Sequence, residues 1–330
     1  MYTKIFDVIL LKIVEGILEG DRRSLSRAIS LIDNEEGDYQ EIIRQIFKKT
    51  GKAMTIGFTG PGGSGKSSLI SKLVNEFKEF GYKIAIIAVD PTSPITGGAI
   101  LGDRIRMQGN IIDNSDLFMR SIASRGAIGG VSKSLRNIIR ILDAAGYNLI
   151  IVESVGAGQL EIEVSKIVNL TIVLFTPNTG DKVQAIKAGI TEIGDVYIVN
   201  KADIEGANTL YNTLKDLIGE TEKKPTILKC SAKTGKGVRE IAENIHKMLI
   251  DRLTNFQEKE QGLLESELKD MVLNILQDKI LNMLDNNPSY HNLIDKIQNK
   301  KVDPYQAADD LVSSLLNNLI NEYPKNIKKH

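Results

Sequence analysis

The sequence has few of the features that would direct a chain to an oxidising compartment or onto a polyanion. Its 330 residues include one cysteine, Cys230, and no tryptophan. Because one cysteine cannot form an internal disulfide, we expect a reducing, cytoplasmic setting with Cys230 buried. The 42 basic and 42 acidic residues give a formal net charge of zero. This balance disfavours binding to nucleic acid or to an anionic membrane surface.

Long hydrophobic runs are also lacking. No apolar stretch approaches the ~18 residues that are needed to span a bilayer. The most apolar part near the N-terminus, residues 5–20, is interrupted by Asp7, Lys12 and Glu15 at helical spacing. We therefore predict an amphipathic helix there, not a signal or an anchor, in a soluble protein.

Hydrophobic periodicity divides the chain into three parts. Residues 1–50 have helical spacing with breaks near Gly20 and Asn34, which predicts an N-terminal helical extension. Residues 51–252 alternate short β-branched runs with helical ones, and residues 253–330 return to helix alone. The middle part predicts an α/β P-loop NTPase domain, in which a mainly parallel sheet is sandwiched by helices. The strand-like runs cover 54–59, 83–90, 148–154, 170–176, 195–200 and 225–230.

A glycine-rich turn follows the first of these strands. Residues 60–67, GPGGSGKS, match the pattern G-x-x-x-x-G-K-[ST] between a predicted strand and a predicted helix. In such a turn the backbone N–H groups surround a phosphate, the lysine reaches the β- and γ-phosphates and the serine ligates Mg²⁺. The nucleotide-binding residues predicted here are Gly60, Gly62, Gly63, Ser64, Gly65, Lys66, Ser67 and Ser68.

A second motif predicts which base the nucleotide carries. Asn200, Lys201 and Asp203 form N-K-x-D after the strand DVYIVN. A carboxylate at Asp203 can accept both N1–H and N2–H of guanine, Asn200 would hold the loop, and the stem of Lys201 would lie along the base. A backbone N–H from the segment Ser231, Ala232 and Lys233 could reach guanine O6. Together the two loops indicate GTP and GDP as ligands.

Acidic residues near the ends of strands are candidates for the Mg²⁺ site. Asp90 and Glu153 end predicted strands, where acids face the ligand crevice of a parallel sheet. Asp103 lies between them in a glycine-containing stretch, residues 90–107. Each acid alone could equally be a helix cap or a surface residue. Taken as a set, Ser67, Asp90, Asp103 and Glu153 are predicted metal ligands, and Lys66, Asp103 and Glu153 are predicted catalytic residues.

At this point the sequence resembles the GTPase chaperones of adenosylcobalamin-dependent acyl-CoA mutases, a family called MeaB in bacteria, MMAA in humans and ArgK in older usage. Two departures from the usual family pattern concern Leu160, where a serine is usual, and the stretch from Pro177, which reads PNTGD. The resemblance covers nearly the whole chain and rests on residues 20–33, 60–68, 90–107, 120–132, 153–161, 180–203 and 303–309.

The resemblance implies a function that the residues alone do not. It implies Mg²⁺-dependent GTP hydrolysis with a low basal rate, and a homodimer built through the C-terminal helices. It also implies a partner mutase, such as methylmalonyl-CoA mutase, whose cofactor loading and protection depend on the nucleotide. The sequence itself contains no cobalamin-binding D-x-H-x-x-G segment, so the partner would hold the cofactor.

Three rival functions remain to be weighed. The older label implies an amino-acid transport-associated ATPase or kinase, which N-K-x-D disfavours because it selects guanine. A nickel chaperone of the same GTPase class would need a Cys/His cluster, whereas one cysteine and three scattered histidines are present. A translation or targeting GTPase should show a basic face, which zero net charge makes less favourable.

Overall fold

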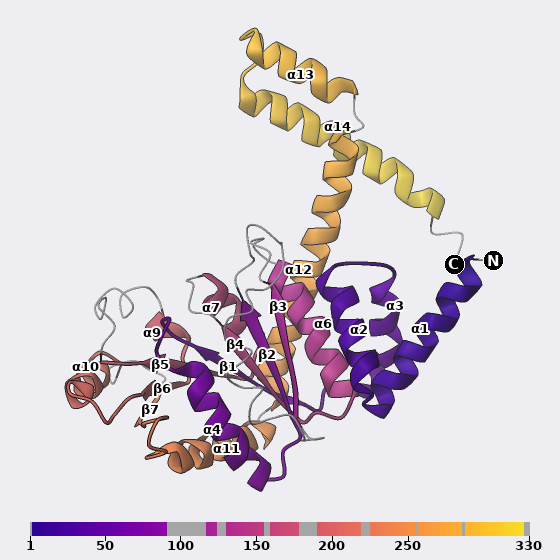
Figure 1. Cartoon of the computed structure of the whole chain (residues 1–330). Helices are drawn as coiled ribbons and strands as arrows, with labels where there is room; N and C mark the ends of the chain where they lie inside the picture. Colours follow the sequence, from indigo (N-terminus) through magenta and orange to yellow (C-terminus); the bar gives the residue numbers. More distant parts are fainter. Residues whose placement is uncertain are drawn as a thin grey trace. The chain divides into compact units, whose positions relative to one another are not determined.

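Seven parallel strands form the sheet that organises the first part of the chain (Figure 1). The structure is a computed structural model, and it describes residues 2–90, 117–123, 130–154, 159–177, 190–218, 225–254, 256–285 and 288–326. The strand order is β3-β2-β4-β1-β5-β6-β7. The strand bounds are β1 Met54–Thr59, β2 Ile84–Asp90, β3 Leu117–Ala123, β4 Leu149–Ser154, β5 Leu170–Phe175, β6 Val196–Val199 and β7 Thr226–Lys229.

Six of these strands are the runs that the sequence predicts, and β3 is the additional one. β3 lies at the edge of the sheet and contains Arg120 and Ser121, which interrupt its apolar pattern. Arg120 donates from Nη2 to the Ser30 hydroxyl at 2.7 Å, so the polar residue is accommodated by the helix that covers this edge. An edge strand with a polar interruption gives a weak periodic signal, which explains why pattern alone misses it.

Helices cover both faces of the sheet. On one face α4 (Lys66–Glu79) and α11 (Val238–Thr254) pack on Ile56, Ile151 and Ile172. The opposite face carries α6 (Gly130–Ala144), α7 (Gln159–Ser165), α9 (Ile190–Ile193) and α10 (Ala207–Ile218). β1, β4, β5 and β6 are buried along their whole length. Their continuous apolar runs are therefore those of strands covered on both faces.

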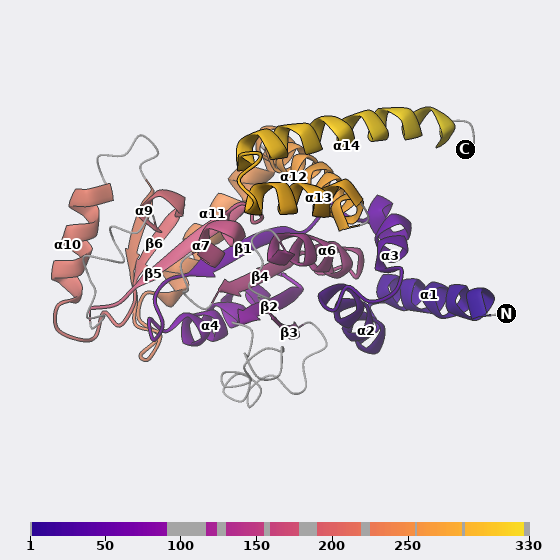
Figure 2. The same cartoon turned by 90° about the horizontal axis from the view of Figure 1, so that it is seen from above.

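Three helices precede the sheet, as the sequence predicts: α1 (Tyr2–Glu19), α2 (Arg22–Asp33) and α3 (Tyr39–Ile46). They pack at the β3 and α6 end of the sheet, whereas α10 lies at the β6 and β7 end (Figure 2). Leu25, Ile29 and Ile42 are fully buried and share one core with α6. Arg22 also donates to the Leu117 carbonyl at 2.6 Å. The N-terminal helices are thus an integral part of the sheet-containing unit.

The turn into β1 is held by one buried carboxylate. Asp143 on α6 accepts backbone hydrogen bonds from Gly51, from Lys52 at 3.1 Å and from Ala53 at 3.0 Å. Its side chain is 8% exposed. Because β1 leads directly into the glycine-rich turn, this contact fixes the base of the strand that carries the candidate site.

Replacing Asp143 with alanine should lower the free energy of unfolding by about 3 kcal/mol, because the amides of Gly51, Lys52 and Ala53 lose their acceptor at a buried position. Asp143→Asn keeps the shape and one acceptor and should cost less. Urea denaturation followed by circular dichroism measures both variants. Asp216→Ala, on the exposed face of α10, is the matched control and should be close to neutral. Equal stability of all three variants would contradict this account.

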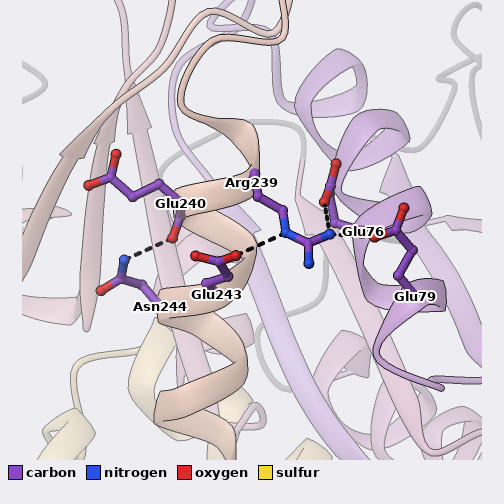
Figure 3. Close-up of polar contacts among 6 residues, drawn as sticks. All are labelled: Glu76, Glu79, Arg239, Glu240, Glu243 and Asn244. Carbon is purple, nitrogen blue, oxygen red and sulfur yellow. Dashed lines mark hydrogen bonds and ion pairs between the residues drawn. The ribbon is translucent and has the colours of Figure 1, made fainter.

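An ion-pair cluster joins α4 to α11 (Figure 3). Arg239 pairs with Glu76 at 2.8 Å, with Glu79, and with Glu243 on its own helix at 2.9 Å. Its guanidinium also lies 5.0 Å from the centre of the Phe80 ring. Since the cluster is half-exposed, its contribution is screened by salt. Its geometric effect is to tie the helix after the glycine-rich turn to the helix after the strand β7.

The chain divides into two compact units, residues 1–259 and 260–330. The second unit contains most of α12 (Phe256–Asp285), with α13 (Pro288–Gln298) and α14 (Pro304–Asn326), and α13 packs against α14. Asp303 caps α14 by accepting from the amides of Tyr305 and Gln306. Among the described residues, no helix is both long and apolar enough to cross a membrane.

One side of α12 is apolar and exposed. Its members recur at the spacing of one helix face, and each side chain is between 43% and 65% exposed. Further along, Ile280, Met283 and Leu284 are only half-exposed. We call the exposed set the α12 stripe; it consists of Leu264, Leu268, Met271, Val272, Ile275 and Leu276.

Candidate functional site

The glycine-rich turn lies between β1 and α4, as the sequence predicts. Gly60, Gly63 and Gly65 all have positive φ, at 135°, 72° and 90°. A side chain at Gly60 would lie 2.2 Å from the Leu174 carbonyl oxygen, and one at Gly65 would lie 2.5 Å from Asn200 Nδ2. By contrast, a Cβ at Gly63 would meet no atom within 4 Å among the described residues. The turn is therefore closed toward the protein and open on the side where a phosphate would lie.

Lys66 lies inside this turn. Its ammonium donates to the carbonyl oxygens of Gly60 at 2.7 Å and Pro61 at 3.2 Å, and the residue is 7% exposed. Next to it, Ser64 is fully buried and Ser68 is exposed on the first turn of α4. A buried ammonium beside backbone amides is a local positive charge that suits a polyphosphate.

Ser67 at the start of α4 and Glu153 near the end of β4 are in direct contact. The Ser67 hydroxyl donates to Glu153 Oε1 at 2.6 Å, and Glu153 is 8% exposed. Ser67 follows Lys66 on α4, and Glu153 is the penultimate residue of β4. The structure therefore brings together two of the predicted metal ligands, a hydroxyl and a carboxylate.

The other two predicted metal ligands are not both placed. Asp90 is the last residue of β2. The residue before it, Val89, pairs with Ser154 of β4, so the backbone of Asp90 lies at the carboxyl-terminal edge of the sheet, as Glu153 does. The side chain of Asp90 and all of Asp103 lie outside the described part of the chain. Their predicted roles stay predictions.

Asn200 connects the glycine-rich turn with both loops of the predicted guanine site. It follows β6, is 1% exposed, and donates from Nδ2 to the Ser64 carbonyl at 2.8 Å. Its Oδ1 accepts from the Ala232 amide at 3.0 Å. Its own amide donates to the Phe175 carbonyl at 2.8 Å. One buried side chain thus fixes the phosphate-binding turn and the segment 231–233 relative to each other.

Lys201 adds a second connection. It has φ of 57°, which is uncommon for a residue with a side chain, and its ammonium donates to the Gly63 carbonyl at 2.9 Å. The sequence indicates only that its stem would lie along the base. The anchoring of its charged end on the glycine-rich turn is an additional finding, since nothing in the N-K-x-D pattern alone specifies it.

Asp203 is exposed and ready to accept hydrogen bonds. A hydrogen bond from the Ser231 hydroxyl, followed by one from its own amide, lowers the pKa of the Asp203 carboxyl below its ordinary value, and Lys233 and Lys201 lower it further. Ser231 itself is fully buried. The carboxylate is therefore held in the ionised form that a pair of base N–H donors requires.

The residue before this segment, Cys230, is buried as predicted. It is 1% exposed, and burial raises the pKa of its thiol to about 12. Its Sγ lies 3.5 Å from Asn200 Oδ1. A protonated, buried thiol of this kind packs as a small apolar group and has no thiolate chemistry.

The site as a whole lies at the carboxyl ends of β1, β4, β6 and β7. Three of its features could not be read from motifs: the direct contact between Ser67 and Glu153, the anchoring of Lys201, and a buried hydroxyl pair formed by Thr59 and Ser154 at 3.0 Å. In each case the partners are more than 80 residues apart in the sequence. Among the described residues, no three His, Cys, Asp or Glu side chains gather into a metal-binding group.

Comparison with known proteins places these features in a family. The profile of the methylmalonyl-CoA mutase-associated GTPase MeaB matches residues 25–287. A GTPase of Pyrococcus horikoshii is 41% identical over 92% of this chain and 98% of its own length. The GTPase ArgK of Escherichia coli is 34% identical over 69% of this chain and 72% of its own, and the mouse methylmalonic aciduria type A homolog is 27% identical over 92% and 79%.

Among solved structures, the crystal structure of an LAO/AO transport system kinase has a TM-score of 0.67 with 23% identity, and the match covers 94% of this chain and 98% of that one. At this identity the likeness concerns the fold, a P-loop domain with added helices. The relatives are named as GTPases, and the described turn and base loops are those of a protein that binds and hydrolyses GTP. The chain belongs to the MeaB family of GTPases.

Proposed function

We propose that this protein is a chaperone of an adenosylcobalamin-dependent mutase, methylmalonyl-CoA mutase or a close relative, acting in the cytoplasm. In this role GTP binding and hydrolysis gate the loading of the cobalamin cofactor and protect the loaded mutase. The family match across residues 25–287 is the observation that supports the choice of partner. The mouse relative, whose name refers to methylmalonic aciduria, supports it further.

The geometry supports guanine nucleotides as the controlling ligands. Asn200 holds the phosphate turn and the base loops together through Ser64 and Ala232. Because the Ala232 amide already donates to Asn200, we assign the contact with guanine O6 to the amide of Lys233. GTP and GDP would therefore occupy one continuous surface, with Asp203 selecting guanine over adenine.

The donor set also fits Mg²⁺, which prefers hard oxygen ligands. Ser67 and Glu153 present a hydroxyl and a carboxylate next to each other, and we propose that they hold the ion with Asp90 and Asp103. When bound with the nucleotide, Mg²⁺ would neutralise charge that develops on the β- and γ-phosphates. Lys66 would add its positive charge to the same phosphates from inside the turn.

We further propose that the protein is a homodimer. The α12 stripe exposes six apolar side chains on one face of a helix, which is more than a helix fully surrounded by water needs. A second copy is the simplest partner for an apolar stripe of this kind, because an isologous contact places the same residues on both sides.

The alternative function, an amino-acid transport-associated ATPase or kinase, matches the name of one structural neighbour, the LAO/AO transport system kinase. It would require preference for adenine and transfer of a phosphoryl group to a substrate. The guanine-selective arrangement of Asp203 and Asn200 favours the chaperone. Comparing turnover of ATP and GTP, and testing for a phosphorylated product other than inorganic phosphate, separates the two functions.

The partner proposal is tested by capture and by turnover. The purified chain, loaded with a non-hydrolysable GTP analogue or with GDP, is used as bait in the native lysate. We expect an adenosylcobalamin-dependent mutase subunit to be retained in a nucleotide-dependent amount, and the purified mutase to accelerate GTP hydrolysis. Lys66→Ala, which cannot hold the triphosphate in the same way, is the matched control bait. If no such mutase is retained and none of the purified mutases changes turnover, the chaperone proposal is wrong.

A further inference from the structure

The turn that follows α4 carries an aromatic cluster outside the nucleotide site. Phe80 is the C-cap of α4, and Gly81, with φ of 86°, turns the chain toward β2. His246 of α11 contacts the residues on both sides of Gly81. Its ring stacks on Phe80 with the ring centres 4.5 Å apart, and its Nδ1 lies 3.0 Å from the Tyr82 hydroxyl. With Arg239, these side chains form what we call the Phe80 cluster, which consists of Phe80, Tyr82, Arg239 and His246.

Arg239 covers the other face of the Phe80 ring. Its guanidinium lies 5.0 Å from the centre of that ring. Arg239 and His246 are seven residues apart, so they lie on one face of α11, two turns or about 10.5 Å from each other. Because the stacked His246 ring occupies one face of Phe80, the guanidinium takes the other. Phe80 is therefore held between two residues of α11, and Figure 3 shows the same guanidinium directed at Glu76 and Glu79 of α4.

The two helices joined here begin at the two parts of the nucleotide site. α4 starts at Lys66 in the phosphate turn, and its 14 residues extend about 21 Å away from that turn. α11 starts at Val238, shortly after the segment 231–233, and the Ser231 amide donates to the Lys236 carbonyl at 3.0 Å in the turn between them. Asn200 connects the two parts at the site itself. The Phe80 cluster connects them a second time, at the far end of α4.

The cluster supplies directional contacts that apolar packing does not. α4 and α11 also share a buried core, which includes Phe77 and Ile245. Helices that pack through apolar side chains alone can slide past each other by small amounts. A ring held on both faces and a guanidinium paired with carboxylates have preferred geometries that favour one register.

We propose that the Phe80 cluster sets the separation between the phosphate turn and the base segment 231–233, and that it thereby determines how long a guanine nucleotide stays bound. A nucleotide is held at both ends. When one end detaches, it rebinds before the other end leaves only if its subsite stays at the matching distance, which is an effect of local concentration. The four residues of the cluster are therefore positioning residues, which act through α4 and α11 without contacting the nucleotide.

The test compares a ligand that spans both parts of the site with one that occupies the phosphate turn alone. The first is a fluorescent GDP analogue, whose release rate is measured by chase with unlabelled GDP. The second is inorganic pyrophosphate with Mg²⁺, measured by isothermal titration. In Phe80→Ala we expect release of GDP to be roughly tenfold faster and the affinities for GTP and GDP to fall by the same factor, with the affinity for pyrophosphate within about twofold of the wild type. No mutase is present, so the outcome does not depend on the chaperone proposal.

Variants on α11 carry the test if Phe80→Ala does not fold. Arg239→Gln and His246→Ala each uncover one face of the ring at a partly exposed position, and each should release GDP roughly threefold faster. Their combination should release it no faster than Phe80→Ala, because all of these changes free the same ring. His246→Phe keeps the stacking and should recover most of the wild-type behaviour. Lys247→Gln removes an exposed charge next to His246 and, as the matched control, should change neither measurement.

Two results would overturn the proposal. The first is release of GDP at the wild-type rate in Arg239→Gln, in His246→Ala and in their combination. The second is an equal loss of affinity for GDP and for pyrophosphate, because it would show that the substitutions deform the phosphate turn itself and do not change its separation from the base segment.

Discussion

Asp203→Asn is expected to lower the affinity for GTP at least about tenfold and to raise the affinity for xanthosine triphosphate. In the proposed contact the carboxylate accepts two N–H donors of guanine, whereas an asparagine amide offers one acceptor and one donor. Xanthine presents N1–H beside a carbonyl, which matches that amide. Because the Ser231 hydroxyl lowers the pKa of Asp203, the wild-type preference for GTP should also persist at a pH where an ordinary aspartate starts to take up a proton.

Isothermal titration with GTP, ATP and xanthosine triphosphate measures this change of preference. Glu205→Gln is the matched control, since it removes an exposed carboxylate two residues further along the same loop. It should leave all three affinities unchanged. If the Asp203→Asn variant binds GTP as tightly as the wild type, this carboxylate does not form hydrogen bonds with the base.

Leu268→Asp combined with Ile275→Asp is expected to weaken the proposed homodimer at least about a thousandfold. Both side chains lie in the α12 stripe and are more than half exposed, so the substitutions should cost the single chain little. In a symmetric contact each substitution occurs twice, and burying carboxylates in place of apolar anchors is strongly unfavourable. Light scattering should then give the chain mass of 36.4 kDa instead of twice that value.

The control for the dimer prediction introduces the same charges elsewhere on α12. Asn274→Asp combined with Gln277→Asp changes two exposed residues on the side of the helix away from the stripe. This variant should keep the mass of the wild type. A wild-type chain that is monomeric from nanomolar to high micromolar concentration would remove the homodimer from the proposal.

The regular part of the fold is predictable from the sequence because its signals are local. Buried strands such as β1, β4 and β5 are short apolar runs bounded by turn residues, and the turns at Gly20 and near Asn34 separate the N-terminal helices. The sequence pattern does not predict β3, because Arg120 and Ser121 interrupt its apolar residues. Its pairing with β2 and its cover by α2 are long-range contacts, which periodicity does not encode.

The candidate site likewise has a part that the sequence predicts and a part that only the structure shows. The glycine-rich turn and the N-K-x-D segment are contiguous motifs, so the places of residues such as Lys66 and Asn200 in the fold could be predicted from the sequence. The contact of Ser67 with Glu153 and the anchoring of Lys201 on Gly63 join residues that are distant in sequence. Such contacts depend on strand order and register, and only the structure gives them. The positions of Asp90 and Asp103 around Mg²⁺ stay predictions.

The two hydrogen bonds of the Asn200 side chain limit how the nucleotide preference of this protein could change. Since one buried amide group bonds both Ser64 and Ala232, base recognition is not a separate module that can be exchanged while phosphate binding stays intact. A transplanted base loop would have to bring its own asparagine, at the same depth, or leave a carbonyl of the phosphate turn without its donor. A change of nucleotide preference that leaves this junction intact is therefore confined to exposed positions such as Asp203.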